Sequence, residues 1–316
     1  GRDPAAVIGG KLPLIGGYGK AGKGNCIVIE ACEYAETFLK LTPDIAVLLN
    51  IDNDHLDYYG TMGQLKFAFK KFALMATHTI VANADDEGVI QIINSIDRNV
   101  RTFGIQKGAD YQAVNIREYK PGFYEFDVTE WEMPYAHLRL GAPGYHNIYN
   151  ALAMVSCSRL LGLTPGDAEA AAQDFKGAGR RFEILGEISG VTIADDYAHH
   201  PTEVAATLST AKKLGFKRVW AVHQPFTYSR TKALLDEFAL VLRAADKVVL
   251  TPIMGSREVD DGSVKTADLA AKVPGSVEVA GLREAAEYIK AHAEPGDFVI
   301  TLGCGDVYKA ARMMLE

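Results

Sequence analysis

The sequence predicts an α/β protein of two domains, each with a mostly parallel sheet. Three observations support this prediction. The chain has 316 residues, which exceeds a typical single domain. Short apolar runs rich in β-branched residues alternate with helical patterns. A glycine-rich break, residues 176–180, interrupts this alternation, so we expect domains of residues 1–179 and 180–316.

The first domain opens with short, nearly continuous apolar runs around one helical pattern. Such runs are typical of strands buried on both faces of a parallel sheet. Further on, apolar and polar residues alternate, which predicts antiparallel strands attached to that sheet. The expected strands are residues 26–31, 45–50, 79–82 and the alternating region 110–140, and the expected helices are residues 64–76 and 147–161.

The second domain repeats the strand–helix alternation. This order favours a parallel sheet with helices on both faces. The expected strands are residues 191–194, 218–222, 247–250 and 298–302, and the expected helices lie near 201–214, 232–244, 265–272 and 282–292.

Composition excludes several classes of function. The formal net charge of −7 argues against nucleic-acid binding through a basic surface. The four cysteines form no C-x-x-C pair and suit a reducing cytosol. The apolar runs are far shorter than the about 18 residues of a membrane helix. We therefore expect a cytoplasmic protein that binds neither nucleic acid nor membranes.

Acidic residues stand at the ends of the first two expected strands, where ligands bind in open α/β sheets. Glu30 closes the run 26–31, and a buried carboxylate is costly unless it is paired or bound to a metal. His55, with Asp54 and Asp57 beside it, offers imidazole and carboxylate ligands to a divalent ion. An ion pair with a lysine and a simple helix cap are the structural alternatives.

His146, Asn147 and Asn150 stand where a strand gives way to a helix. The two asparagines share one face of the first turn, and their amides suit a base edge or a ribose, although plain helix capping is the favoured interpretation of this stretch in isolation. Arg180 and Arg181 follow the expected boundary. Guanidinium groups match phosphate bidentately, and a salt bridge between domains is the alternative.

The densest polar cluster follows residues 191–194 and contains Asp195, Asp196, His199 and His200 directly before Pro201. Proline is favoured at the first position of a helix, and a helix N-terminus favours anions. Four such residues together favour function over structure. Arg230 follows the next strand and suits a carboxylate, or is a surface arginine.

Two glycine-rich stretches imitate phosphate-binding loops. Gly17 to Lys23 fits the start of the G-x-x-x-x-G-K pattern, but Gly24 follows where Ser or Thr would bind Mg²⁺. The stretch also precedes a strand instead of following one, so we interpret it as a hairpin or loop. Gly303 and Gly305 form a lone G-x-G, which is weak evidence for a dinucleotide.

In this order, the motifs resemble those of the Mur ligases, which build the stem peptide of peptidoglycan. The stretch from Asp195 to Glu203 is similar to that of the alanine-adding members. The resemblance rests on Glu30-Ala-x-Glu33, Asn50-Ile-x-x-Asp-His55, Gly144-x-His-Asn-x-x-Asn150, Gly179-Arg-Arg-Phe-Glu183, Asp195-Asp-Tyr-x-His-His-Pro-Thr-Glu203 and Gln224-Pro-x-x-Tyr-Ser-Arg-Thr231.

The resemblance implies that residues 1–179 are part of the family's central ATP-binding domain and that 180–316 are its Rossmann-like C-terminal domain. The family's UDP-binding domain and its Gly-x-x-Gly-Lys-Thr loop are missing from the sequence, which starts at Gly1. We therefore expect a fragment that is inactive on its own.

The resemblance also implies the chemistry. ATP and Mg²⁺ activate UDP-N-acetylmuramic acid as an acyl phosphate, which the amine of L-alanine attacks. Two positions depart from the family: Cys32 replaces a frequent Asp, and Phe226 replaces a frequent His. The implied roles are Mg²⁺ binding by Glu30 and His55, binding of the nucleotide base side by His146, Asn147 and Asn150, ATP contacts by Arg181 and Asp196, and amino-acid positioning by His199 and Arg230, with Asp196, His199 and Arg230 as the catalytic set.

Three alternatives remain open. A tripeptide-recycling ligase of the same family differs mainly around residues 224–231. A non-catalytic nucleotide-binding module would have lost its phosphate-binding loop. A metal-dependent hydrolase would gather His55, His146, His199 and His200 around one ion.

Overall fold

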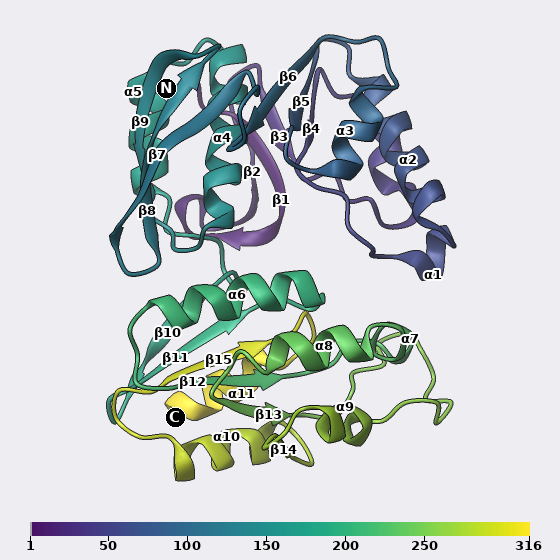
Figure 1. Ribbon diagram of the computed structural model, residues 1–316, viewed down its shortest axis with the longest axis vertical. Coiled ribbons are helices and arrows are strands. Elements are labelled where there is room, and N and C mark those ends of the chain that lie inside the picture. Colours follow the sequence, from purple (N-terminus) through teal and green to yellow (C-terminus); the bar gives the residue numbers. More distant parts are fainter. Residues whose placement is uncertain (1) are drawn as a thin grey trace. The chain divides into compact units, whose positions relative to one another are not determined.

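The computed structural model describes residues 2–316, without the side chain of Asp57. The chain divides into two compact units. The first contains residues 19–176 together with the chain up to Ile8, and the second contains residues 9–18 and 177–316. Figure 1 shows a sheet with flanking helices in each unit.

The large sheet of the first unit is mixed. Its strand order is β4-β5-β6-β7-β8-β9. The pairs from β4 to β7 are parallel, and those from β7 to β9 are antiparallel, which confirms the expected change of rhythm. The strands are β4 (Ile45–Leu48), β5 (Thr79–Asn83), β6 (Val100–Gly104), β7 (Tyr111–Lys120), β8 (Phe123–Glu130) and β9 (Met133–Arg139).

Helices cover both faces of this sheet because each has one apolar face to bury. Residues of α2 and α3 pack with β4 and β5 in one core cluster. Residues of α4 and α5 pack with β6 to β9 in another. The helices are the 3-10 segment η2 (Tyr34–Lys40), α1 (Leu56–Tyr59), α2 (Met62–Met75), α3 (Glu87–Ile93), α4 (His146–Leu160) and α5 (Pro165–Asp174).

The strand predicted over residues 26–31 is present, but the prediction that it is buried is wrong. Strand β3 (Ile27–Ile29) is exposed along its whole length, with Ile27 at 55%. It pairs in parallel with β1 (Ala5–Leu12), in a three-stranded sheet of order β2-β1-β3 that is separate from β4. An apolar run predicts a strand, but it does not say which partner covers it.

The glycine-rich stretch is a strand and a loop, not a phosphate-binding loop. Strand β2 (Gly17–Lys20) follows the short 3-10 turn η1 (Pro13–Ile15), and the chain then passes to β3 without a helix. A Cβ atom at Gly22 would lie 2.3 Å from the carbonyl oxygen of Asp3, and one at Gly24 would lie 1.9 Å from that of Arg2. These glycines therefore permit a close approach of two backbone segments.

The second unit contains the predicted parallel sheet. Its order is β10-β11-β15-β12-β13-β14, and only the β10–β11 pair is antiparallel. The four expected strands are confirmed. The strands are β10 (Glu183–Ile188), β11 (Val191–Asp196), β12 (Val219–His223), β13 (Lys247–Leu250), β14 (Val277–Glu278) and β15 (Phe298–Leu302).

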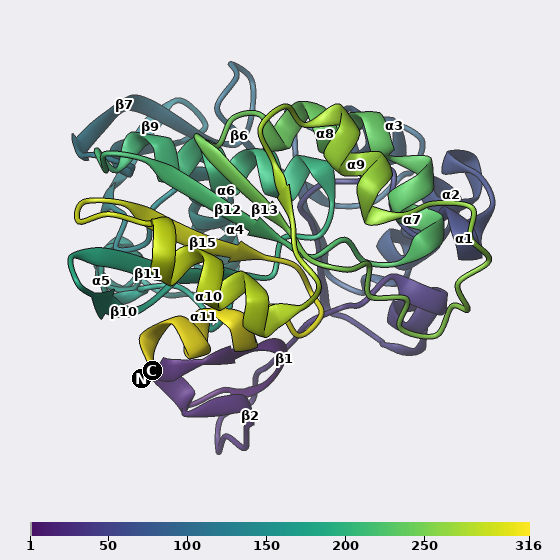
Figure 2. The same ribbon diagram turned by 90° about the horizontal axis from the view of Figure 1, so that it is seen from below.

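Helices lie on both faces of this sheet (Figure 2). Core residues of α6, α8 and α9 pack on one face, and those of α10 and α11 pack on the other. The single helix expected over 232–244 is instead α7 and α8, separated at Leu234. The helices are α6 (Pro201–Lys213), α7 (Tyr228–Ala233), α8 (Leu235–Leu242), α9 (Thr266–Lys272), α10 (Leu282–His292) and α11 (Tyr308–Leu315).

In the described part of the chain, no helix is long and apolar enough to cross a membrane.

A buried ion pair joins the starts of the two central strands of the second unit. Asp297 is fully buried before β15 and accepts hydrogen bonds from the Arg218 guanidinium at 2.9 and 2.7 Å. It also accepts one from the Trp220 indole at 2.9 Å. The amide of Glu294 donates to the same carboxylate at 3.0 Å. Because these donors share one buried acceptor, its loss leaves the Trp220 indole and the Glu294 amide without that acceptor and takes from the half-buried Arg218 its shorter ion pair.

We expect Asp297→Ala to lower the free energy of unfolding of the second unit by about 3–5 kcal/mol. The control is Glu294→Ala, whose exposed carboxylate pairs with Lys217 and Arg218 and should contribute less than about 1 kcal/mol. Urea unfolding measures both. Equal effects of the two variants would contradict the assigned role of Asp297.

Candidate active site

Three sequence motifs of the second unit leave the same edge of its sheet. Strands β11, β12 and β15 are parallel, and Asp196 and His223 both pair with Leu302 at the ends of these strands. The segments after these strands carry the His199, Arg230 and Gly303 motifs. In open α/β sheets, ligands bind at the carboxyl ends of the strands. The sequence motifs therefore converge where the fold favours a site.

Arg180 has a structural role within the second unit. Its Nε donates to Asp195 Oδ2 at 2.9 Å, and a terminal nitrogen donates to the Gly303 carbonyl at 2.7 Å. Asp195 is 1% exposed and also accepts from Thr301 Oγ1 at 2.6 Å. Burial nevertheless raises the pKa of Asp195. The guanidinium of Arg180 is therefore committed to holding strand ends together.

Asp196 is also buried, but its partners are backbone amides. Oδ2 accepts from the amide of Phe182 at 2.7 Å, and Oδ1 accepts from that of Ala198 at 2.7 Å. Burial outweighs these bonds and raises the pKa of Asp196 to about 6. With both oxygens engaged in this way, Asp196 positions the chain on either side of it. Its expected contact with ATP stays a prediction.

His199 and His200 are organised by one carboxylate on α6. The backbone amides of both histidines donate to Glu203 Oε2, at 2.9 and 3.2 Å. His200 caps the helix in return, and Pro201 is its first residue, as the sequence predicts. His199 Nδ1 lies 3.0 Å from the carbonyl oxygen of Tyr197. A carbonyl only accepts, so Nδ1 of His199 carries a proton.

Arg181 and Arg230 are the more accessible cations of this edge. The Arg181 side chain is 52% exposed and lies 3.5 Å from Glu203 Oε1. Its guanidinium also lies 5.2 Å from the centre of the Tyr197 ring. Arg230, on α7, is half-buried and donates to the Phe226 carbonyl at 3.4 Å. The structure thus separates the predicted arginine pair, since Arg180 is internal and Arg181 faces solvent.

Gln224 fixes the G-x-G segment against the same edge. Its Oε1 accepts from the amides of Asp306 and Val307 at 3.0 and 3.2 Å, and its Nε2 donates to Asp306 Oδ1 at 2.9 Å. A Cβ atom at Gly305 would lie 2.4 Å from that Oε1. This glycine is therefore explained by close packing and needs no dinucleotide.

In the first unit, His55 pairs with a residue that we did not select as a ligand. His55 Nε2 lies 3.1 Å from Glu33 Oε1 and 3.6 Å from Asp54 Oδ2. The hydrogen bond to His55 holds the pKa of Glu33 below its ordinary value. The second glutamate of Glu-Ala-x-Glu was the available sequence signal for this pairing.

Glu30 was selected as a metal ligand because it was expected to be buried, and the structure contradicts that expectation. It follows an exposed strand and is itself exposed, so no burial cost requires a metal there. Among the described residues, no group of three or more His, Cys, Asp or Glu side chains is placed to hold a metal ion. The hydrolase alternative would draw His55 and His146 from the first unit and His199 and His200 from the second, and it stays a prediction.

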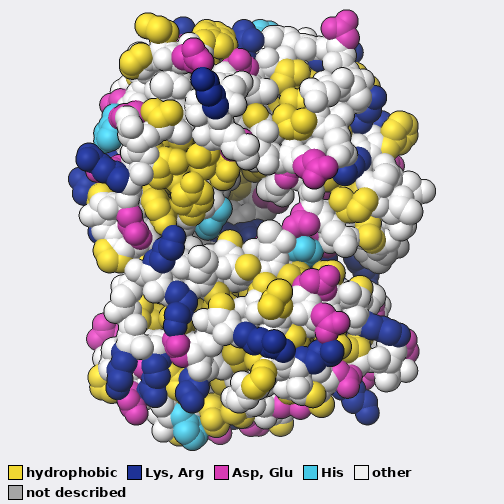
Figure 3. Space-filling model, viewed as in Figure 1, with side chains coloured by type: hydrophobic (Ala, Val, Ile, Leu, Met, Phe, Trp, Pro, Cys, Tyr) yellow, Lys and Arg dark blue, Asp and Glu magenta, His cyan; other side chains and the backbone are white. Residues whose placement is uncertain are grey.

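The polar residues at the start of α4 differ in role: one holds the local backbone, and the others are exposed. Asn147 Nδ2 donates to the Pro143 carbonyl at 2.7 Å, and Asn147 Oδ1 accepts from Asn150 at 3.0 Å. His146 and Asn150 are exposed. Tyr145 is 44% exposed and packs edge-on against Tyr124. Figure 3 shows hydrophobic side chains gathered over this part of the first unit.

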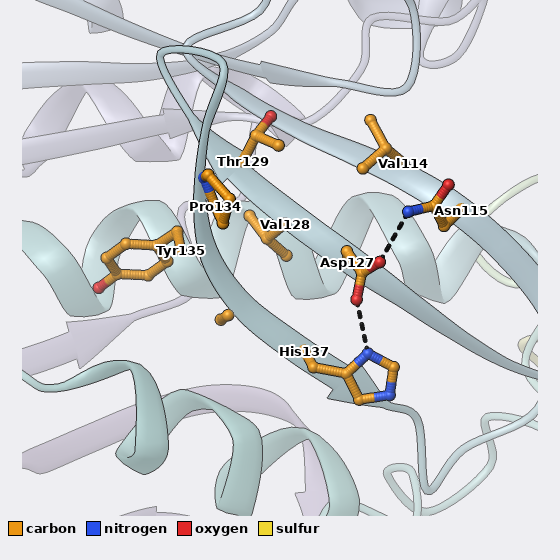
Figure 4. A pocket seen from close by; sticks show the side chains of 9 residues that line it. Val114, Asn115, Asp127, Val128, Thr129, Pro134, Tyr135 and His137 are labelled. Atoms are coloured by element: carbon orange, nitrogen blue, oxygen red, sulfur yellow. Dashed lines mark hydrogen bonds and ion pairs between the residues drawn. The ribbon is translucent and has the colours of Figure 1, made fainter.

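An open hollow of 540 Å³ lies elsewhere on the first unit, on β7, β8 and β9. Asp127 stands between His137 and Asn115, at 2.7 and 2.8 Å (Figure 4). Hydrogen bonds from Asn115 and His137 keep the pKa of Asp127 low. These side chains bridge neighbouring strands, and none was selected from the sequence. We interpret them as cross-strand pairing on an exposed sheet face.

Both halves of the chain match one family. Residues 20–158 match the Mur ligase middle domain, and residues 180–305 match the Mur ligase glutamate ligase domain. The UDP-N-acetylmuramate–L-alanine ligase of Caldanaerobacter subterraneus subsp. tengcongensis is 41% identical over 100% of this chain and 70% of its own length. The enzyme of the same name from Alkaliphilus metalliredigens is 42% identical over 99% of this chain and 69% of its own.

Solved structures agree with this match. The crystal structure of UDP-N-acetylmuramate–alanine ligase from Thermotoga maritima has a TM-score of 0.81 and 26% identity, covering 99% of this chain and 68% of that one. A murein peptide ligase from Psychrobacter arcticus has a TM-score of 0.69 at 23% identity, with 99% and 71% covered, which shows the shared fold.

The burial of His223 leads us to expect that the stability of the second unit depends on pH. Neither of its ring nitrogens has a hydrogen-bond partner, and burial lowers its pKa from 6.5 to about 4. Below about pH 6.5 His223 binds a proton in the unfolded chain but stays neutral in the folded unit. The free energy of unfolding therefore decreases as the pH is lowered from about 6.5 to about 4. By about pH 5 the loss reaches about 2 kcal/mol. The raised pKa of Asp196 acts with the opposite sign.

His223→Leu should therefore remove a loss of about 2 kcal/mol between about pH 7.5 and about pH 5. Trp131 and Trp220 are the two tryptophans of the chain, one in each unit. In a Trp131→Phe background, Trp220 fluorescence during urea unfolding reports the second unit alone. An identical pH dependence with His223 and with Leu would contradict the prediction.

Proposed function

Because this chain belongs to the Mur ligase family, we propose that it carries out ATP-dependent ligation of L-alanine to UDP-N-acetylmuramic acid in peptidoglycan synthesis. The observation that carries the proposal is the identity of about 40% with enzymes of that name over essentially the whole chain. The convergence of the His199 and Arg230 motifs on one sheet edge supports it. In this proposal residues 1–179 bind ATP and residues 180–316 bind the amino acid.

The reaction proceeds through an acyl phosphate. The γ-phosphoryl group of ATP passes to a carboxylate oxygen of UDP-N-acetylmuramic acid, and ADP leaves. The nitrogen of L-alanine then attacks the activated carbonyl carbon and forms a C–N bond. The bond between that carbon and the phosphate oxygen breaks, and phosphate leaves. Such chemistry needs positioning and charge stabilisation more than covalent help from the protein.

The residues of the second unit suit the amino acid. Arg230 is a half-buried guanidinium, which matches a carboxylate. His199, whose Nδ1 is bonded to the Tyr197 carbonyl, is proposed to accept a proton from the ammonium group of alanine before the amine attacks. Asp196 holds the backbone between Phe182 and Ala198, and thereby the segments that carry Arg181 and His199. Arg181 is proposed to contact ATP phosphate.

The residues of the first unit suit the nucleotide and its metal. His146 and Asn150 are exposed beside the aromatic Tyr145, which offers a base both polar contacts and a stacking surface. Asn147 holds Asn150 in place.

Mg²⁺ prefers oxygen ligands and keeps several waters, so one or two carboxylates suffice, and no cluster of three protein ligands is required. Glu33 and Asp54, grouped around His55, fit that chemistry. Binding of Mg²⁺ by Glu30 and His55, which the resemblance implies, stays a prediction. When bound, the ion neutralises phosphate charge.

The proposal predicts phosphate release from ATP that requires both UDP-N-acetylmuramic acid and L-alanine. We would assay the full-length product of the gene with ATP, Mg²⁺ and UDP-N-acetylmuramic acid, with L-alanine either added or left out. Alanine-dependent release by the full-length product supports the ligase. Release only with a tripeptide in place of alanine would assign the recycling ligase instead. No release with any amino acid from folded protein would favour a nucleotide-binding module.

Arg230→Ala should raise the KM for L-alanine about 10- to 100-fold, because a charged hydrogen-bonded contact contributes about 1.5–3 kcal/mol. The KM for ATP should stay within about twofold. Lys232→Ala, a basic residue of the same helix, is the matched control. A parallel rise in both KM values would argue against amino-acid recognition by Arg230.

A further inference from the structure

Helix α7, which carries Arg230, does not cap its own N-terminus. The first amides of a helix have no acceptor within it, so a side chain usually supplies one. Thr227 occupies the N-cap position, yet its side chain makes no capping hydrogen bond. The helix is only six residues long, so little of its order comes from its own hydrogen bonds.

The missing cap comes from Glu258, which lies 29 residues away in sequence. Its Oε2 accepts from the backbone amide of Ser229 at 2.9 Å. Its Oε1 accepts from the Ser229 hydroxyl at 2.5 Å. Although burial alone would raise the pKa of Glu258, the bonds from Ser229 and further bonds from Thr227 and Tyr228 hold it below its ordinary value. An ionised carboxylate thus binds the residue before Arg230.

The loop that carries Glu258 is itself fitted closely to the Arg230 segment. The amide of Met254 donates to the Pro225 carbonyl at 2.9 Å, and Met254 forms a parallel bridge with Phe226. A Cβ atom at Gly255 would lie 2.6 Å from a ring carbon of Tyr228. Residues 254–258 therefore contact residues 225–229 at several points, and Glu258 provides the last of these contacts.

The loop turns back on itself at this point. The amide of Glu258 donates to the Gly255 carbonyl at 2.9 Å. The glutamate is therefore held by its own backbone while its carboxylate holds α7. A pre-organised acceptor orders its partner at a lower entropic cost than a mobile one.

We propose that Glu258 is a positioning residue for amino-acid recognition, acting by fixing the start of α7 and so the approach of Arg230 to the carboxylate of L-alanine. This inference rests on the proposed ligase function. Glu258 itself touches no substrate group in this scheme. Its effect must therefore pass through Arg230, and that dependence can be measured.

The kinetic test uses the full-length product of the gene. Glu258→Ala should raise the KM for L-alanine at least about tenfold and leave the KM for ATP within about twofold. Glu258→Gln, which keeps one acceptor oxygen, should give an intermediate KM. Asp260→Ala is the matched control, because that carboxylate lies in the same loop and accepts only the local amide of Gly262.

A double-mutant cycle separates positioning from general damage. In an Arg230→Ala background, Glu258→Ala should have no further effect on the KM for L-alanine, because both act through one contact. Independent, additive effects would overturn the proposal. So would an unchanged KM in Glu258→Ala alone, or an equal rise for ATP and alanine.

Hydrogen exchange tests the order of α7 without any activity. Glu258→Ala should speed exchange of the amides in residues 227–231 and leave α6 unchanged. Unchanged exchange in α7 would overturn the proposal. If the wild-type protein releases no phosphate with alanine, the proposed function fails, whereas the exchange result still decides whether Glu258 orders α7.

Discussion

The burial of two adjacent carboxylates at the end of β11 constrains the whole edge of the second unit. Asp195 is 1% exposed and Asp196 is 6% exposed. Successive residues of a strand point to opposite faces, so the two cannot share partners. One is neutralised by the Arg180 guanidinium, and the other by backbone amides that include that of Phe182. Residues 180–182 must therefore lie against this strand end, since burying either charge without partners is strongly unfavourable.

The same constraint shapes the backbone. Arg180 and Phe182 adopt positive φ angles of 61° and 49°, which are unfavourable for residues with side chains. The hydrogen bonds to Asp195 and Asp196, together with one from the Tyr197 amide to the Arg180 carbonyl, hold this conformation. Strain of this kind persists only where the surroundings over-determine it. As a result Arg181, between the two, presents its side chain at the surface.

Patterns with a fixed period predicted the central strands and several helices of both units, because periodicity follows from which face is buried. They did not predict β6, β10, β14, α3, α5 or α11. The same signal failed for β3, where Ile27 to Ile29 are apolar and yet exposed. At the site, residue types predicted the cluster after β11 but could not divide its roles between Asp195, which binds a cation, and Asp196, which binds amides. The contact of Glu258 with Ser229 leaves no local signal at all, because it joins a loop to the first turn of α7, and only the folded sheet brings the two together.

The bond between Glu258 and Ser229 divides the loop between β13 and α9 into two parts that differ in their tolerance of change. Before Glu258 the loop is packed against the Arg230 segment. After it, Val259 is 87% exposed, and the carboxylates of Asp260 and Asp261 accept the amides of Gly262 and Ser263 in local turns. The entropy of loop closure grows slowly with length, and exposed loop tips accept insertions. The exposed residues 259–263 are therefore a suitable place for an epitope or a covalent fluorophore, beyond the bond that holds α7.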